Sequence, residues 1–405
     1  MNEPLPLMRK DLEFIPLQHE GQQLVLIRDQ LGLVEEGKAI SPALYQVMVL
    51  LDGTRTMRDL QMVLMRQKGG VLVGTDEVKA LLDHLDDSCL LDSERFRVAR
   101  DRIVAEFASK KVRPCSHCGQ SYPKDVSELE GRLNEILASQ PPIPEPEGKI
   151  RALVAPHIDF AAGHRVYSRA YQTLSYTAPS RVVVLGVRHS LAGELFSLTD
   201  KDFETPMGVI RNEQTLINEL REVGGDIISE SDFPHRSEHS IEFQSIFLQH
   251  LLKGKGFTII PILCGSIQSC FPDCSRDVYL EKATPFLNKL RETLMEAEGE
   301  TLLVAGVDFS HIGPKFGHER PAQYLEGQSE AHDKNLMEYL CKLDADRFWE
   351  ESRNVNDQFN VCGFSALACM LEILPPCKGE VLGYQLWHEE ATRSAVSFAA
   401  ILFTS

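Results

Sequence analysis

The sequence predicts an α/β protein with a mostly parallel sheet and helices on both faces, preceded by a small winged-helix-like domain. Two observations predict the sheet. Continuous apolar runs, typical of strands buried on both faces, alternate with helical patterns in the second half of the chain. Two more apolar runs near the end are expected to close the sheet. The four internal runs are 150–157, 181–189, 257–265 and 301–309, and the closing runs are 379–388 and 394–403.

The order of these patterns divides the chain into three segments. Residues 1–100 predict the small domain, in which Ser41 before Pro42 and Thr56 before Asp59 are helix-start signals. Thr75 is expected to cap its third helix. Residues 101–148 are expected to form a helix followed by a linker. The linker is predicted because SQPPIPEPEG holds four prolines. Residues 149–405 predict the α/β domain.

Charge and composition exclude several classes of partner. The formal net charge of −17 opposes binding to nucleic acid or to an anionic membrane surface. No run reaches the ~18 apolar residues of a membrane span, and the N-terminus lacks an apolar signal segment. The ten cysteines then indicate a reducing compartment. We expect a cytoplasmic protein, and the sequence leaves its oligomeric state open.

Polar side chains follow three of the predicted strands. His157 follows the first, His189 the second, and Asp308 with His311 the fourth. Because parallel strands bring their carboxyl ends to one edge, these side chains are expected to share a crevice. His239 and Cys362, which precede two predicted helices, fit the same crevice.

His157, His189 and Cys362 form a set that suits zinc, copper or iron. The position of Cys362 at a helix start favours its thiolate, the form that ligates metals. Other interpretations remain open. The histidines could be hydrogen-bonded structural residues, Cys362 a core thiol and Asp308 a turn cap. Glu238 and Glu242 are expected to be solvated or capping residues. The two cysteines of PCSHCG (114–119) have no second cysteine pair at zinc-ribbon spacing, so the sequence assigns them no function.

Six motifs in order resemble the MEMO family, which is similar in fold to the class III extradiol dioxygenases. They are APHIDFAAG, VVVLGVRHS, SEHSIEFQ, FTIIPILCG, VDFSHIG and NVCGFSAL. The resemblance implies a metal set of His157, His189 and Cys362. It also implies acid–base roles for His239 and His311, beside Asp308. The third iron ligand of the dioxygenases is a carboxylate, and Cys362 stands in its place here.

A second resemblance concerns the first domain. LLDGTRTMRDLQMVL and VKALLDHLDDSCLL resemble the PqqD-like fold, whose members bind leader peptides or accompany radical-SAM enzymes. Proteins of bacteria and archaea that are similar to the second domain are named for a system, AmmeMemoRadiSam, that includes a radical-SAM protein. The two resemblances together imply a radical-SAM protein or a peptide as partner.

Three functions are compatible with these observations. The first is a metal-dependent oxidoreductase with copper or iron, in which His239 and His311 act as general acid and base and Asp308 orients His311. The second is a non-catalytic protein that binds a peptide or a protein partner. The third is a zinc-dependent hydrolase, with His239 or Glu238 as general base.

Overall fold

The structure is a computed structural model that describes residues 4–189, 193–270, 275–295 and 301–405. The chain divides into two compact units. Unit 1 is Met1–Ser109 with Glu389–Arg393, and unit 2 is Lys110–His388 with Ser394–Ser405. Within the described residues, no helix combines the length and apolar character that a membrane crossing requires.

Unit 1 combines a small antiparallel sheet of order β1-β2-β3 with helices α1, α2 and α3 around its own apolar core, and helix α4 follows them in the chain. The predicted caps at Ser41 and Thr56 are confirmed, and Thr56 forms a reciprocal capping box with Asp59. The predicted cap at Thr75 is wrong, because that residue is the first of its helix and Gly74 precedes it without a side-chain bond. The elements are β1 (Leu12–His19), β2 (Gln22–Asp29), β3 (Ala39–Ile40), α1 (Pro42–Val49), α2 (Met57–Gln67), α3 (Thr75–Asp87) and α4 (Glu94–Ser109).

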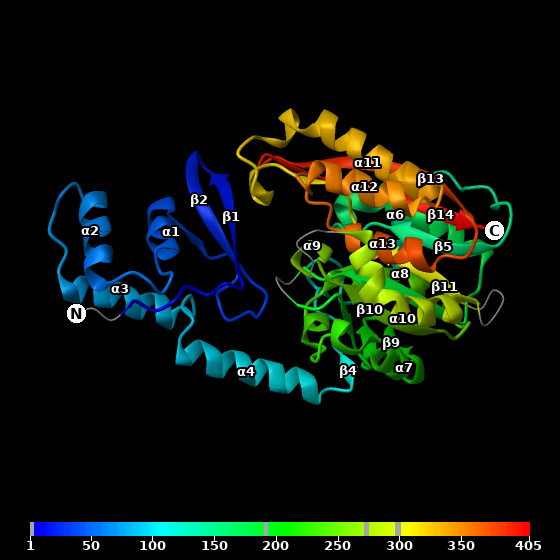
Figure 1. Ribbon diagram of the computed structural model, residues 1–405, viewed down its shortest axis with the longest axis horizontal. Helices are drawn as coiled ribbons and strands as arrows, with labels where there is room; N and C mark the ends of the chain where they lie inside the picture. The colour runs from blue at the N-terminus through cyan, green and yellow to red at the C-terminus, as the bar shows by residue number, and fades with distance from the viewer. Residues whose placement is uncertain (1–3, 190–192, 271–274, 296–300) are drawn as a thin grey trace. The chain divides into compact units, whose positions relative to one another are not determined.

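Unit 2, whose strands β5, β10, β11, β13 and β14 are labelled in Figure 1, is built on a sheet of order β12-β14-β5-β11-β6-β10-β9-β8-β4, with β13 beside β14 and β7 beside β10. The central strands β5, β11, β6 and β10 are parallel, which confirms the predicted fold class. The strands are β4 (Val112–Arg113), β5 (Ile150–Ala155), β6 (Arg181–Val187), β7 (Phe196–Leu198), β8 (Asp202–Thr205), β9 (Gly208–Asn212), β10 (Thr258–Cys264), β11 (Thr301–Gly306), β12 (His311–Ile312), β13 (Lys378–Glu389) and β14 (Ser394–Thr404).

Helices cover both faces of this sheet, and alternate strand residues point to opposite sides. In β6, Val182 and Val184 belong to the core beneath α5, α6 and α8, whereas Val183 and Leu185 belong to the core beneath α7 and α10–α13. This double burial explains the continuous apolar runs. The helices are α5 (Val126–Ala138), α6 (Phe160–Gln172), α7 (Gln214–Gly224), α8 (His239–Leu251), α9 (Ile267–Cys270), α10 (Arg276–Met295), α11 (Glu326–Cys341), α12 (Ala345–Val355) and α13 (Phe364–Ile373).

The structure differs from the linker predicted for residues 101–148. Residues up to Ser109 continue α4 in unit 1, and residues from Lys110 belong to unit 2. Strand β4 pairs with β8, and Leu129 and Leu133 of α5 are fully buried in the α/β core. The apolar face of α5 thus ties this segment to unit 2, and the proline-rich stretch is not the boundary.

Candidate metal centre

The register of the central strands brings three polar side chains to one edge of the sheet. Strands β5, β11 and β6 are neighbours, and Gly306 of β11 pairs with Ala155 of β5. The residue two positions beyond each strand is polar: His157 after β5, Asp308 after β11 and His189 after β6. Extending the strand register puts His157 level with Asp308 and His189 one residue further along β6, so the three side chains come together outside the carboxyl ends.

His157 is held in a fixed orientation by its surroundings. Its Nδ1–H donates to the carbonyl of Gly306 at 2.9 Å, and its backbone N–H donates to Oδ1 of Asp308 at 3.0 Å. Nε2 therefore faces the crevice, 3.6 Å from Sγ of Cys362 and 3.7 Å from Oδ2 of Asp308. Burial would lower the pKa of His157, but Asp308 and Cys362 raise it to about 9. The environment of Nε2 thus favours positive charge.

His189 is oriented by Glu238, the residue that also begins helix α8. The Nδ1 atom of His189 lies 3.0 Å from both carboxylate oxygens, and its backbone N–H donates to Oε2 at 3.2 Å. Glu238 also accepts from the backbone N–H groups of His239 and Ser240 as the helix N-cap. Its capping role is confirmed, whereas the expected solvation is wrong, since Glu238 is buried. Burial would raise the pKa of Glu238, but His189 lowers it well below the usual range.

Cys362 completes the group from a third segment. It precedes α13, whose N-cap is Gly363, and so occupies the predicted helix-start position. The candidate ligand atoms of His157, His189 and Cys362 all lie within 4.8 Å of one another. Burial would raise the pKa of the Cys362 thiol, but His157 and His189 lower it, which favours thiolate.

The separation of the Cys362 and His157 donor atoms fits two ligands of a single metal ion. Ligand bonds of ~2.0–2.3 Å in tetrahedral arrangement separate donor atoms by roughly 3.3–3.8 Å. The Sγ–Nε2 separation of Cys362 and His157 is 3.6 Å. Two imidazoles fixed through Nδ1 and one favoured thiolate are also the donor chemistry that zinc, copper and iron accept.

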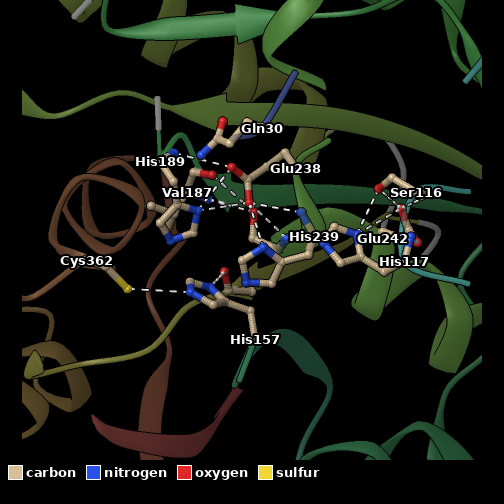
Figure 2. A network of polar contacts seen from close by, with 12 residues as sticks. Gln30, Ser116, His117, His157, Val187, His189, Glu238, His239, Glu242 and Cys362 are labelled. Carbon is tan, nitrogen blue, oxygen red and sulfur yellow. Dashed lines mark hydrogen bonds and ion pairs between the residues drawn. The ribbon is translucent and has the colours of Figure 1, made fainter. Parts of the chain in front are cut away.

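His239 and His311 lie beside this group. The ring of His239 is centred 5.1 Å from the rings of both His157 and His189 (Figure 2). Burial and these two neighbours lower the pKa of His239. His311 donates from Nδ1 to the carbonyl of Phe309 at 2.9 Å, and burial lowers its pKa to about 3. Both histidines are therefore neutral at physiological pH.

The orientation of His311 differs from the one predicted. We expected Asp308 to orient His311, but the carbonyl of Phe309 holds its Nδ1 atom. The carboxylate of Asp308 instead accepts from the backbone of His157 and faces the Nε2 atom of that residue. Burial raises the pKa of Asp308, although His157 opposes the increase.

The roles of two residues near the centre were not predicted. Glu242, which we expected to be solvated or capping, is buried and accepts from Arg113, Ser116 and Tyr122. The ring of His117, between the two cysteines of PCSHCG, is centred 5.4 Å from the ring of His239. The only local signal was a histidine inside a C-x-x-C pair, and its relation to α8 depends on tertiary packing.

The fold and this group define an α/β protein with a candidate metal-ligating set at the carboxyl edge of a parallel sheet. The model of the Memo-like protein family matches residues 113–402. A MEMO1 family protein of Aquifex aeolicus is 28% identical over 399 residues, which cover 98% of this chain and 100% of that protein. One of Thermus thermophilus is 27% identical over 353 residues, 86% of this chain and 99% of that protein. The chain belongs to the Memo-like protein family.

A solved structure also resembles part of the chain. It is that of an uncharacterized protein from Escherichia coli K12, with a TM-score of 0.37 and 15% sequence identity. The match covers 63% of this chain and 99% of that protein.

Proposed function

We propose that this protein is a metal-dependent oxidoreductase whose ion is held by His157, His189 and Cys362. The observation that supports this most directly is the convergence of three donor atoms, from three separate segments, within 4.8 Å. The two imidazoles also have their Nδ1 atoms engaged by Gly306 and Glu238, which leaves the Nε2 atoms for an ion. A histidine with a purely structural role at the end of a strand would need neither the neighbouring donor atoms nor a free Nε2 atom.

The metal we propose is copper or iron, with zinc as the alternative. A thiolate is softer than the carboxylate of a two-histidine iron triad, and this favours copper or zinc more than the dioxygenase arrangement does. A bound copper or iron ion would supply electron-transfer chemistry, whereas zinc, which has no redox chemistry, would polarise a bound group or activate a bound water.

The remaining residues of the site have roles that follow from their positions. His239, next to both histidine ligands, would exchange a proton with a bound substrate. His311 presents Nε2 because its Nδ1 is held by Phe309, so it would serve as the second acid–base group. Asp308 is a positioning residue, since it holds the backbone of His157 and faces its ring.

The test is the metal content of full-length protein purified without oxygen. We expect stoichiometric metal in the wild type and its loss in His157→Ala and Cys362→Ser. His164→Ala and Cys341→Ser, at half-buried positions outside the donor set, are matched controls that should retain the metal. Copper or iron would support an oxidoreductase and zinc alone a hydrolase. Metal retained in both site variants would refute the proposed ligands.

A second role, in partner recognition, is supported by unit 1. This unit has its own apolar core, and its sequence resembles the PqqD-like fold. We propose that it binds a peptide or a radical-SAM protein. Co-purification with a co-expressed radical-SAM protein should survive His157→Ala and be lost when residues 1–109 are removed. Retention by the shortened chain would contradict this role.

A further inference from the structure

The loop between β4 and α5 carries a second chemically active group. Cys115 and Cys118 are joined as a disulfide with their Cα atoms 5.9 Å apart, and both residues are half-buried. A bridge between residues three apart restricts the unfolded chain far less than one that closes a long loop. The C-x-x-C spacing is, however, that of disulfides that exchange with thiols. The spacing of the pair therefore favours a redox role over a role in stabilising the fold.

The two residues between the cysteines are bound to helix α8. The backbone N–H groups of Ser116 and His117 donate to the two oxygens of Glu242, at 3.0 and 2.9 Å, and Oγ of Ser116 donates to it at 2.7 Å. Glu242 lies about one helical turn after His239 on the same helix. The disulfide loop is therefore attached to the helix that starts at the candidate metal centre.

His117 makes the contact between this loop and the histidine group. Its ring is centred 5.4 Å from the ring of His239, and Figure 2 shows the two side chains next to each other. The ring of Phe243 is centred 5.7 Å from that of His117. Its Nδ1 atom lies 2.8 Å from Oγ of Ser116. Because the hydroxyl of Ser116 donates to Glu242, Nδ1–H of His117 donates to Ser116. A change in the loop backbone would thus reach the ring of His239 through a single intervening side chain.

We propose that Cys115 and Cys118 form a thiol–disulfide exchange site for a dithiol, and that the redox state of the pair sets the position of His117 against His239. A thiolate of the dithiol attacks one sulfur, breaks the protein S–S bond and forms a mixed disulfide. The second thiol of the reductant then displaces the protein sulfur. Two electrons and two protons pass to the cysteine pair, and the reductant becomes a disulfide. This chemistry is independent of the metal proposed above.

The exchange is tested on wild-type, full-length, metal-free protein, so it does not depend on the folding of a variant. The protein is equilibrated with graded ratios of reduced to oxidised dithiothreitol, quenched in acid, alkylated and analysed by peptide mass. We expect the Cys115–Cys118 peptide to change reversibly between bridged and doubly alkylated forms, with Cys341 alkylated throughout. A pair that stays bridged, or stays reduced, at every ratio overturns the exchange site.

The coupling to His117 has its own readout. The histidine Cε1–H resonances are followed by NMR over the same dithiothreitol ratios. The signals of His117 and His239 should shift, and the dithiothreitol ratio at the midpoint of that shift should equal the ratio at which half of the cysteine pair is reduced. The signal of His164 should stay constant. The double variant Cys115→Ser/Cys118→Ser should abolish the shift. Unmoved His117 and His239 signals while the cysteines cycle overturn the coupling.

Discussion

Glu238 shows how one side chain links the start of a helix to the orientation of a candidate ligand. Its carboxylate accepts from the first backbone N–H groups of α8 and from Nδ1 of His189. Because the same two oxygens serve both purposes, the position of the helix start and the direction of the imidazole are coupled. His157, by contrast, is oriented by a backbone carbonyl, which no single substitution of a side chain removes.

This difference leads to a prediction for Glu238→Gln. The amide still occupies the N-cap but carries no charge to hold Nδ1–H of His189, so metal affinity should fall by roughly 10–100-fold. A competition titration against a chelator measures the change. Glu230→Gln, which removes the same charge at an exposed position, is the control and should leave the affinity unchanged. Equal affinities of wild type and Glu238→Gln would show that Glu238 does not support the ligand.

At this scale the sequence predicted which residues meet but not how they are held. His157, His189, Asp308 and Cys362 were found because the ends of apolar strands and a helix start are visible in the pattern. Glu242 was missed, because its burial against Arg113 arises from residues about 130 positions apart. No local periodicity reports such a contact.

At the scale of elements, the contact between β6 and the start of α8 requires a glycine. A Cβ at Gly186 would lie 2.6 Å from both the side chain of Ile241 and Oγ of Ser240. Ser240 in turn donates to the carbonyl of Val187 and accepts from its N–H. The absence of a side chain at Gly186 lets the helix that carries His239 approach the strand that leads to His189.

Gly186→Ala should therefore lower the free energy of unfolding of unit 2 by about 1–3 kcal/mol, because the added methyl overpacks the contact. Gly131, inside α5, is the matched control: a Cβ there meets nothing within 4 Å. Gly131→Ala should raise stability by about 0.5–1 kcal/mol through the higher helix propensity of alanine. Denaturant unfolding compares them, and equal effects of both substitutions would contradict the tight contact.

In unit 1, a buried ion pair joins the N-terminal segment to the end of β2. The guanidinium of Arg9 donates to Asp29 at 2.7 Å, and both side chains are almost fully buried. Burial would raise the pKa of Asp29, but the hydrogen bond from Arg9 lowers it below its usual value. The pair thus contributes stability above the unfolded pKa of about 3.9 and loses it as pH falls through the folded value.

Asp29→Asn should destabilise unit 1 by up to about 3 kcal/mol at pH 7, because the buried Arg9 then keeps only the half-exposed Asp11 as a partner charge. The difference from wild type should begin to shrink below about pH 4, where Asp29 of the unfolded chain becomes protonated, and should be lost as pH falls through the lower folded pKa. Urea unfolding at a series of pH values measures both effects. A difference that stays constant between pH 7 and pH 3 would show that the charge of Asp29 is not the cause.

The elements that the sequence predicted are those with long, self-contained patterns. The buried strands 150–157, 181–189, 257–265 and 301–309 correspond to β5, β6, β10 and β11, and the two closing runs to β13 and β14. The short strands β4 and β7 were not predicted, because two or three residues gain strand geometry only from a partner. The role of α5 in the α/β core was missed for a similar reason: proline-rich sequence follows it and suggested a linker.

At the scale of the whole molecule, the two units have separate apolar cores. All the candidate ligands belong to unit 2. A ligand that binds only the folded state of one unit stabilises that unit by mass action. Metal binding and the stability of unit 1 are therefore expected to be separable properties of one chain.

Metal added at about 100 times its dissociation constant should raise the stability of unit 2 by about 2.7 kcal/mol. The unfolding transition whose temperature Asp29→Asn lowers is that of unit 1. Added metal should leave the temperature of this transition unchanged. Calorimetry of wild type and Asp29→Asn, each with and without metal, resolves the two contributions. A metal-dependent shift of the unit 1 transition would contradict separate stabilisation.

The central claim is that His157, His189 and Cys362 bind one ion together, and cobalt(II) absorption tests it most directly. Cobalt(II) added to metal-free protein should give a tetrahedral d–d spectrum with a thiolate-to-metal charge-transfer band. Cys362→Ser should lose the charge-transfer band, His157→Ala should weaken binding, and Cys341→Ser should match the wild type. A charge-transfer band that persists in Cys362→Ser, or a wild-type spectrum of hydrated cobalt alone, would contradict the claim.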